Sequence, residues 1–301
     1  MESGSLPLAA ERDTRVWKIW LALLAVYVIW GSTYLAIRVA VETFPPFMMT
    51  SIRYFFAGGA LLLFLLLRGA PLPSRVEWRN GLLTGGLMLG VGTGGIAFAE
   101  QQGVASGLAA LAVAAVPLWA SLFAGLWGHW PSKREWGGVL IGLIGVAILN
   151  MEHSMQSTPI GALAAIVGPM GWALGSIWGR QLKLPGGLMT TAVQMMGGCL
   201  TLAVITVLFG ERLTAMPSGP SILALVYLVT FGALVAFSAY TYLLEHVRPA
   251  LATSYAYVNP LVAVFLGVLL ANEQMTLYGM VAMGVILAGV ALLALGKTRA
   301  H

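Results

Sequence analysis

Charged residues are scarce in this sequence. Only 9% of its 301 residues are Asp, Glu, Lys or Arg, and 59% are hydrophobic, whereas about a quarter of a typical soluble domain is charged. So few charges cannot cover the surface of a soluble globule of this size. The composition therefore excludes a soluble enzyme, a disordered chain and a nucleic-acid binder. It predicts an all-α integral membrane protein that has the lipid bilayer as its surroundings.

Cysteine, aspartate and acidic clusters are also nearly absent. Cys199 is the only cysteine, which excludes a disulfide framework, and Asp13 is the only aspartate. No carboxylate lies near the middle of an apolar run, and no nucleotide-binding motif is present. Metal sites and intramembrane proton relays need such carboxylates or clustered ligands. We therefore expect no metal site, no cofactor and no enzymatic catalysis, and we expect any transport to be secondary or facilitative.

The hydrophobic residues that are present form ten runs, separated by proline, glycine and charged residues. A helix needs about 20 mostly apolar residues to cross roughly 30 Å of hydrocarbon, so each run predicts one transmembrane span, the fifth being the shortest. The predicted spans are residues 19–41, 47–67, 81–99, 107–126, 137–149, 160–182, 189–208, 222–244, 250–270 and 277–295. The connections between them are too short for a domain outside the membrane.

Lysine and arginine are distributed unevenly between the two sides of these ten spans. Cytoplasmic loops of membrane proteins carry an excess of both residues. The termini and the even-numbered connections hold thirteen of the 16, the opposite side holds only Arg212, and Arg38 and Arg53 lie within spans. The asymmetry predicts that both termini are cytoplasmic.

The two halves of the chain repeat each other weakly. Several residues recur 140 to 143 positions later in the sequence. The recurring pairs include Trp30 and Trp172, Tyr34 and Ser176, Arg38 and Arg180, and Pro117 and Pro260. Each half has five spans, an odd number, so the halves enter the membrane from opposite faces. The pattern predicts inverted repeats at residues 1–152 and 153–301, an architecture typical of secondary transporters that bind substrate between the halves.

Three segments carry longer motifs. They are Trp30-Gly31-Ser32-Thr33-Tyr34 in the first span, Ile52-Arg53-Tyr54-Phe55-Phe56-Ala57-Gly58 in the second, and Asn259-Pro260 with Asn272-Glu273-Gln274-Met275-Thr276 and Gly279 at the ninth and tenth. Together they resemble the signature of EamA-type carriers in the drug/metabolite transporter superfamily, most closely the YddG-type amino-acid exporters. The resemblance implies a ten-helix bundle that moves small metabolites, often outward, across a bacterial inner membrane. The first half departs from the pattern, because His129-Trp130 stands where the second half has Asn272-Glu273.

Two stripes of side chains are candidates for a binding site. Trp30, Tyr34 and Arg38 share one face of the first span because they are spaced four residues apart. Trp172 and Ser176 form the corresponding face of the sixth span. We hypothesise that both faces line a central cavity that binds substrate, with Arg38 at a gate. The alternative is that the tryptophans pack between helices and that Arg38 is an interfacial anchor.

Arg53 is a further candidate because it lies about 9 Å into the second span, at a rise of 1.5 Å per residue. An unpaired charge at that depth costs several kcal/mol. Glu100 and Glu42 lie at the same predicted level and are candidate partners. One interpretation is a structural salt bridge. The other interpretation is functional: Arg53 and Glu100 form an external gate, or Arg53 binds the carboxylate of a substrate.

The ninth span is unusually polar. Thr253, Tyr255, Tyr257 and Asn259 occur within seven residues, and the eighth span adds Tyr240. Polar groups in lipid need partners, so this cluster indicates surroundings lined by protein or water. We include all five among the candidate substrate-binding residues, although interhelical hydrogen bonds would also explain them.

Proline interrupts two of the predicted spans. Pro117 in the fourth span and Pro260 in the ninth are candidate hinges, because a proline inside a helix removes one backbone hydrogen bond. Proline kinks are also common in transmembrane helices that have a purely structural role.

Taken together, these features predict a secondary transporter of small neutral or zwitterionic metabolites. The resemblance implies amino acids, including aromatic ones, exported across the inner membrane by alternating access. Aromatic faces could hold an ammonium group, while Arg53 or helix N-termini could hold a carboxylate. One chain is expected to suffice, because its two halves can enclose a path. The alternatives are a facilitative channel, a structural membrane scaffold and, least favoured, an intramembrane enzyme.

Overall fold

The computed structural model of the chain describes residues 6–102, 112–150, 158–259, 261–262 and 277–294. All regular secondary structure in these ranges is helical. Six of the described helical stretches are long and apolar enough to cross a membrane, namely Val16–Thr33, Pro46–Leu67, Arg75–Ala99, Pro159–Gly179, Gly187–Leu208 and Gly219–His246. Two shorter apolar helices, Ala112–Leu126 and Gly284–Leu293, lie within the fourth and tenth predicted spans. The chain is therefore an all-helical membrane protein.

The first half folds into α1 (Leu6–Val41), α2 (Pro46–Leu67), α3 (Arg75–Gly85), η1 (Gly86–Thr93), α4 (Gly94–Gln101), α6 (Val116–Leu126) and α7 (Lys133–Asn150). Local chemistry sets where two of them begin. Pro46 occupies the first turn of α2, where its missing N–H leaves no partner unsatisfied. Ser74 and Glu77 form a reciprocal capping box at the start of α3. α1 begins well before residue 19, the predicted start of the first span.

The second half folds into α8 (Pro159–Gly179), α9 (Gly187–Leu208), α10 (Gly219–Tyr227), η2 (Leu228–Val235), α11 (Ala236–His246), α12 (Pro249–Ala252) and α14 (Leu277–Ala294). Thr158 and Ser218 cap α8 and α10 by accepting hydrogen bonds from backbone N–H groups of the first turn. Gly186 and Gly187 lead into α9 with φ angles of 86° and 52°. Only glycine adopts such angles without strain, so these two residues permit the turn.

Two long helical rods contain a π-helical segment. α3, η1 and α4 follow one another without interruption, as do α10, η2 and α11. In the middle of each rod, eight residues are wound as a π-helix, Gly86–Thr93 in the first and Leu228–Val235 in the second. Such segments are rare and often occur at functional sites. The two lie 142 residues apart, which is the spacing at which the sequence halves recur.

The fourth and ninth predicted spans are interrupted where the structure describes them. The chain turns at Ala115 just before α6, and again at Thr253 and Ser254 after α12. Pro117 lies in the first turn of α6, a position where proline is well tolerated. Pro260, the other candidate hinge, lies outside the described residues. The interruption beside Pro117 gives the fourth span a natural place to bend.

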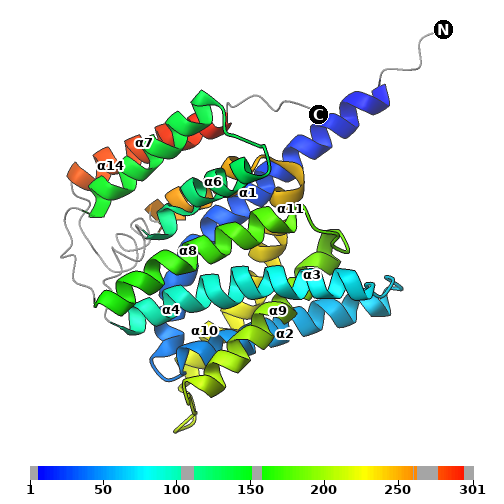
Figure 1. Cartoon of the computed structure of the whole chain (residues 1–301), viewed down its shortest axis with the longest axis vertical. Helices are drawn as coiled ribbons and strands as arrows, with labels where there is room; N and C mark the ends of the chain where they lie inside the picture. The colour runs from blue at the N-terminus through cyan, green and yellow to red at the C-terminus, as the bar shows by residue number, and fades with distance from the viewer. Residues whose placement is uncertain (1–5, 103–111, 151–157, 260, 263–276, 295–301) are drawn as a thin grey trace.

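Helices from the first half of the chain pack against helices from the second half. α2 packs along α9 and α7 along α14, and Figure 1 shows the second pair side by side at one edge of the bundle. α1 packs on α10, η2 and α11, while α8 packs on η1 and α4. Glu211, just after α9, accepts hydrogen bonds from the backbone N–H groups of Phe47 (3.2 Å) and Met48 (2.8 Å) at the start of α2. The interface between the halves is therefore the centre of the fold.

Glycine residues allow several of these helices to approach each other closely. A Cβ atom added to Gly90 would lie 2.5 Å from Cγ2 of Thr201 in α9, and one added to Gly175 would lie 2.6 Å from Cγ of Met88 in η1. Small residues let membrane helices approach closely. Gly90 and Gly175 thus lie where the rod of α3, η1 and α4 packs against α9 and α8.

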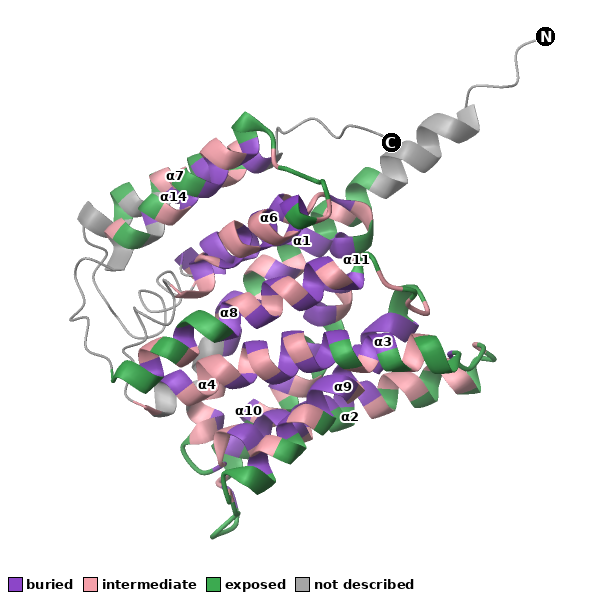
Figure 2. Ribbon diagram, viewed as in Figure 1, coloured by how far each residue is buried: buried purple, intermediate pink, exposed green. Residues whose placement is uncertain are grey.

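The outer surface of the bundle is apolar, as a lipid environment requires. Figure 2 shows buried residues where helices meet and exposed residues on the sides that face outward. Large side chains on this surface include Trp17 (66% exposed), Leu67 (78%) and Val207 (78%). A soluble monomer rarely exposes large contiguous apolar patches. The exposure pattern therefore supports the assignment of these helices to the membrane.

Candidate functional site

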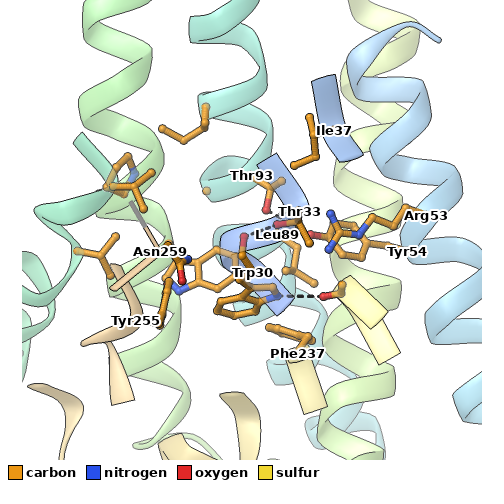
Figure 3. Close-up of a pocket in the computed structure, with 17 residues that line it drawn as sticks. Trp30, Thr33, Ile37, Arg53, Tyr54, Leu89, Thr93, Phe237, Tyr255 and Asn259 are labelled. Carbon is orange, nitrogen blue, oxygen red and sulfur yellow. Dashed lines mark hydrogen bonds between the residues drawn. The ribbon is translucent and has the colours of Figure 1, made fainter. Parts of the chain in front are cut away.

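A cavity lies at the interface between the two halves. Its volume is about 130 Å³, and one water molecule needs roughly 10–15 Å³ of such a cavity. Its walls come from α1, α2, η1, α4 and α6 in the first half and from α8, η2, α11 and the ninth span in the second (Figure 3). The cavity is therefore large enough for a small organic molecule, and both halves would contact it.

An aromatic cluster forms one wall of the cavity. The Trp30 ring contacts Trp172 (5.5 Å between ring centroids), Tyr255 (4.7 Å) and Tyr240 (5.2 Å). Trp30 Nε1 donates a 3.0 Å hydrogen bond to the carbonyl oxygen of Gly232 in η2, which holds the ring in one orientation. Edge-on and offset ring pairs are each worth about 0.5–1.5 kcal/mol beyond burial. Trp30 thus links the first half of the chain to an aromatic cluster in the second half.

Hydrogen-bonded hydroxyl groups fill the interface behind this wall. Tyr240 is fully buried, and its hydroxyl accepts a hydrogen bond from Trp172 Nε1 (3.2 Å) and pairs with the hydroxyl of Ser176 (3.0 Å). The Tyr27 hydroxyl on α1 pairs with Ser254 Oγ at 2.7 Å. The Tyr27–Ser254 pair therefore joins the two halves just before Trp30 on α1, toward the end where α1 begins.

Polar contacts close the same end of the bundle further out. Glu135, at the start of α7, forms a 2.9 Å salt bridge with Arg248, and Arg180 donates a 2.9 Å hydrogen bond to the carbonyl oxygen of Val247. Burial opposes ionisation of Glu135, but hydrogen bonds from Ser132 and Arg248 outweigh it and lower the pKa of this carboxyl group. The Glu135–Arg248 pair is therefore charged at neutral pH and links the two halves.

Arg53 is the one charged side chain among the described residues that line the cavity. The residue is 5% exposed, and its Nε atom is buried without a hydrogen-bond partner. Its guanidinium lies 5.2 Å from the centroid of the Tyr54 ring, and Figure 3 shows it directed toward Thr33. No described carboxylate forms an ion pair with it: Glu42 is exposed, and the side chain of Glu100 lies outside the described residues. The structural salt bridge with Glu42 that the sequence suggested is therefore absent.

Tyr255 and Asn259 lie on the opposite side of the pocket from Arg53 in Figure 3. With its amide oriented to satisfy hydrogen bonding, Asn259 Nδ2 donates to the backbone carbonyl oxygens of Tyr27 (3.3 Å) and Tyr255 (3.1 Å). Asn259 thus ties the ninth span to α1 at the edge of the cavity.

The structure brings most of the predicted site residues that it describes into one region. Those that line the cavity are Trp30, Arg53, Trp172, Tyr255 and Asn259. Ser176 and Tyr240 lie directly behind the aromatic wall, where they hold Trp172 in place. The side chains of Tyr34, Arg38 and Glu100 lie outside the described residues, so the hypotheses about them stay predictions.

Two predicted site residues lie away from the cavity. Thr253 is buried in the turn after α12, and its hydroxyl donates to the carbonyl oxygen of Pro249 (2.8 Å). Tyr257 packs in a separate hydrophobic cluster that contains Ala114 and Val139, and its hydroxyl donates to the carbonyl oxygen of Val139 (3.0 Å). Both hydroxyl groups are satisfied within the bundle. The bond of Tyr257 is interhelical, as the alternative predicts, whereas Thr253 bonds within its own helical turn. We therefore leave both residues out of the proposed site.

Several polar groups of the cavity are not among the predicted site residues. Thr33 and Tyr54 lie inside the motifs quoted above, beside the predicted site residues Tyr34 and Arg53. That position is the sequence feature that points to them. The Tyr54 hydroxyl lies 3.3 Å from Thr93 Oγ1, and Gly232 supplies the carbonyl group that holds Trp30. Thr93 and Gly232 belong to the π-helical segments, which no residue periodicity indicates.

Comparison with known proteins gives consistent matches over nearly the whole chain. The model of the EamA-like transporter family matches twice, over residues 16–151 and 159–295. The sequence is 46% identical over 276 residues to the "Uncharacterized inner membrane transporter YedA" of Escherichia coli K12, which covers 92% of this chain and 90% of that protein. It is 26% identical over 170 residues to the "Probable amino-acid metabolite efflux pump" of Salmonella typhimurium, which covers 54% and 53%.

A solved structure described as "Crystal structure of protein" also superposes on this chain. The TM-score is 0.76 and the sequence identity 22%, with 94% of this chain and 98% of that chain covered. At this level of identity, the likeness shows that the two chains share a fold.

Proposed function

Because this chain belongs to the EamA-like transporter family, it is a membrane transporter, and we propose that it is a secondary carrier of small neutral or zwitterionic metabolites. The observation that carries the proposal is the cavity between the halves, which side chains of both halves line. In carriers of this architecture the halves rock about a central site and open it to each side in turn. The contacts of Tyr27 with Ser254 and of Glu135 with Arg248 join the halves on the side where α1 begins, as a state closed on that side requires.

The proposal includes ten spans in two inverted repeats, residues 1–152 and 153–301. Three observations support it. The family model matches the chain twice, the π-helical segments occupy equivalent positions, and the pairs α2 with α9 and α7 with α14 each join equivalent helices. Inverted halves can exchange conformations, so that the same contacts close either face of the membrane.

Amino acids, including aromatic ones, are the proposed substrate class. The cavity wall is mainly aromatic and apolar, which suits a molecule with a hydrophobic side chain. Similarity to a protein described as an amino-acid metabolite efflux pump also supports this class. We propose export across the bacterial inner membrane, with both termini cytoplasmic, and transport by a single chain.

A transport assay in liposomes tests the proposal. Purified protein should move labelled amino acids across the vesicle membrane without ATP, faster than protein-free vesicles do. Comparing the rates with and without a proton gradient shows whether transport is coupled to protons. If no amino acid or related metabolite moves, the carrier proposal is wrong and the structural scaffold becomes the better interpretation.

The proposed topology predicts a labelling pattern for two exposed loop residues. Met216, between α9 and α10, is 86% exposed, and Leu72, between α2 and α3, is 72% exposed. With Cys199→Ala as the background, a membrane-impermeant maleimide should label Met216→Cys in intact cells and Leu72→Cys only after lysis. Labelling of Leu72→Cys in intact cells would contradict cytoplasmic termini.

A further inference from the structure

The described residues that line the cavity carry charge of one sign only. Arg53 is a cation, and no Asp or Glu occurs among the described residues that line the cavity. The remaining polar groups are hydroxyl, amide and indole groups, which carry no net charge. A cavity with one cation and no anion attracts a negatively charged group more strongly than a positively charged one. A ligand with a single negative charge matches the site better than a ligand without one.

The guanidinium of Arg53 lines the cavity and has no ion-pair partner among the described residues. Its Nε is buried and lacks a hydrogen-bond partner, and no hydrogen bond or ion pair from the described residues satisfies the rest of the group. Gly232 leaves room for it, because a Cβ there would lie 2.8 Å from Arg53 Nη2 and 3.1 Å from Thr33 Cγ2. A planar guanidinium presents its donors as a fork that matches a carboxylate.

Leaving this cation unpaired is costly. The residue is 5% exposed in the middle of a helical bundle, and unpaired charge in a membrane protein is expensive and typically functional. The ring of Tyr54, at 5.2 Å, offsets part of that cost through its π face. Hydrogen bonds to an anion would supply the missing partners. The substrate itself is then the counter-ion of Arg53.

We propose that the cavity binds organic monocarboxylates, with the carboxylate on Arg53 and the apolar part of the molecule against Trp30, Trp172 and Tyr255. This inference rests on the proposed carrier function and extends its substrate class from zwitterionic amino acids to organic monocarboxylate anions. A carboxylate is required for binding, whereas an α-ammonium group is not, because none of the described lining residues is a carboxylate that could receive it. A carboxylic acid without an amino group therefore binds at least as well as the corresponding amino acid.

Two matched series of small molecules test this requirement. The first consists of phenylalanine, 3-phenylpropionate and 2-phenylethylamine, and the second of leucine, 4-methylpentanoate and 3-methylbutylamine. Within each series the hydrocarbon part is similar and the charged groups differ. Calorimetry on the purified protein should detect binding of the carboxylate and the amino acid, and none of the amine. Binding of an amine as tight as that of its carboxylate, or binding of no compound in either series, would overturn the proposal.

Variants of Arg53 test whether the requirement for a carboxylate depends on this side chain. Arg53→Gln should weaken binding of the carboxylates at least tenfold, and Arg53→Lys should retain part of it because the charge stays. Arg68→Gln, which removes an exposed cation at the end of the same helix, should leave binding unchanged. Arg53→Gln should also melt at the same temperature as the parent protein or higher, because it removes an unpaired buried charge. A lower melting temperature together with unchanged carboxylate affinity would assign Arg53 a structural role instead.

The outcomes separate this inference from the carrier proposal. If carboxylates bind through Arg53 and no compound crosses the liposome membrane, the binding site stands and the carrier function fails. If amino acids are transported with rates that do not depend on Arg53, the carrier function stands and the carboxylate seat fails.

Discussion

Replacing Trp30 with alanine is expected to reduce transport at least about tenfold, a loss equivalent to about 1.4 kcal/mol. The Trp30 ring contacts Trp172, Tyr240 and Tyr255, and its Nε1 anchors it to Gly232. Without the ring, the cavity loses its shared wall, and the neighbouring aromatic side chains lose the surface that orients them. The measurement is the initial rate of amino-acid uptake into liposomes that contain equal amounts of folded protein.

Two matched variants control this experiment. Trp30→Phe keeps an aromatic ring and removes the hydrogen bond to Gly232, so its transport rate should lie between those of the parent and Trp30→Ala. Trp17 lies on the same helix but is 66% exposed on the outer surface, so Trp17→Ala should transport normally. Normal kinetics in a well-folded Trp30→Ala protein would remove Trp30 from the substrate site.

Replacing Gly197 with leucine is expected to prevent correct folding. A Cβ at Gly197 in α9 would overlap the carbonyl oxygen of Leu82 in α3 and lie 2.7 Å from its Cα. Both contacts are with backbone, so no side-chain rotation relieves them. Overpacking typically costs about 1–3 kcal/mol and occasionally more, and we expect a destabilisation of about 3 kcal/mol or more here. The measurement is the melting temperature and the monodisperse fraction in detergent.

Gly59 provides the matched control on another membrane helix. A Cβ at Gly59 in α2 would meet no atom within 4 Å, so Gly59→Leu should fold and melt like the parent protein. If Gly197→Leu folded equally well, the close packing of α3 on α9 would not be as the structure describes it.

The membrane class of this protein follows from its sequence with little ambiguity. Each span depends on the apolar content of about 20 consecutive residues, and that property can be read from the chain one segment at a time. The helices α2, α8 and α9 accordingly lie close to the predicted second, sixth and seventh spans. Trp30 and Trp172, which the sequence pairs at a spacing of 142 residues, both line the cavity, and their rings lie 5.5 Å apart.

Other features depended on three-dimensional packing. Tyr255 and Tyr257 are two residues apart and chemically alike, yet Tyr255 lines the cavity and Tyr257 packs against Val139 in another cluster. The π-helical winding of Gly86–Thr93 and Leu228–Val235 leaves no periodic mark in the sequence. Residue spacing places Tyr255 and Asn259 on one face of the ninth span and Thr253 and Tyr257 on another, but only packing decides which face lines the cavity.

Arg53 shows most clearly which features the sequence determines and which only the tertiary structure decides. Its depth in the second span was evident from the sequence, and so was the cost of leaving its charge unpaired. Whether a carboxylate reaches it depends on side chains that several helices bring together, and the structure provides no such partner among the described residues. Hydrophobicity acts on each helix separately, so the sequence determines which segments enter the membrane. The surroundings of a buried charge arise from contacts between distant segments, so only the tertiary structure decides them.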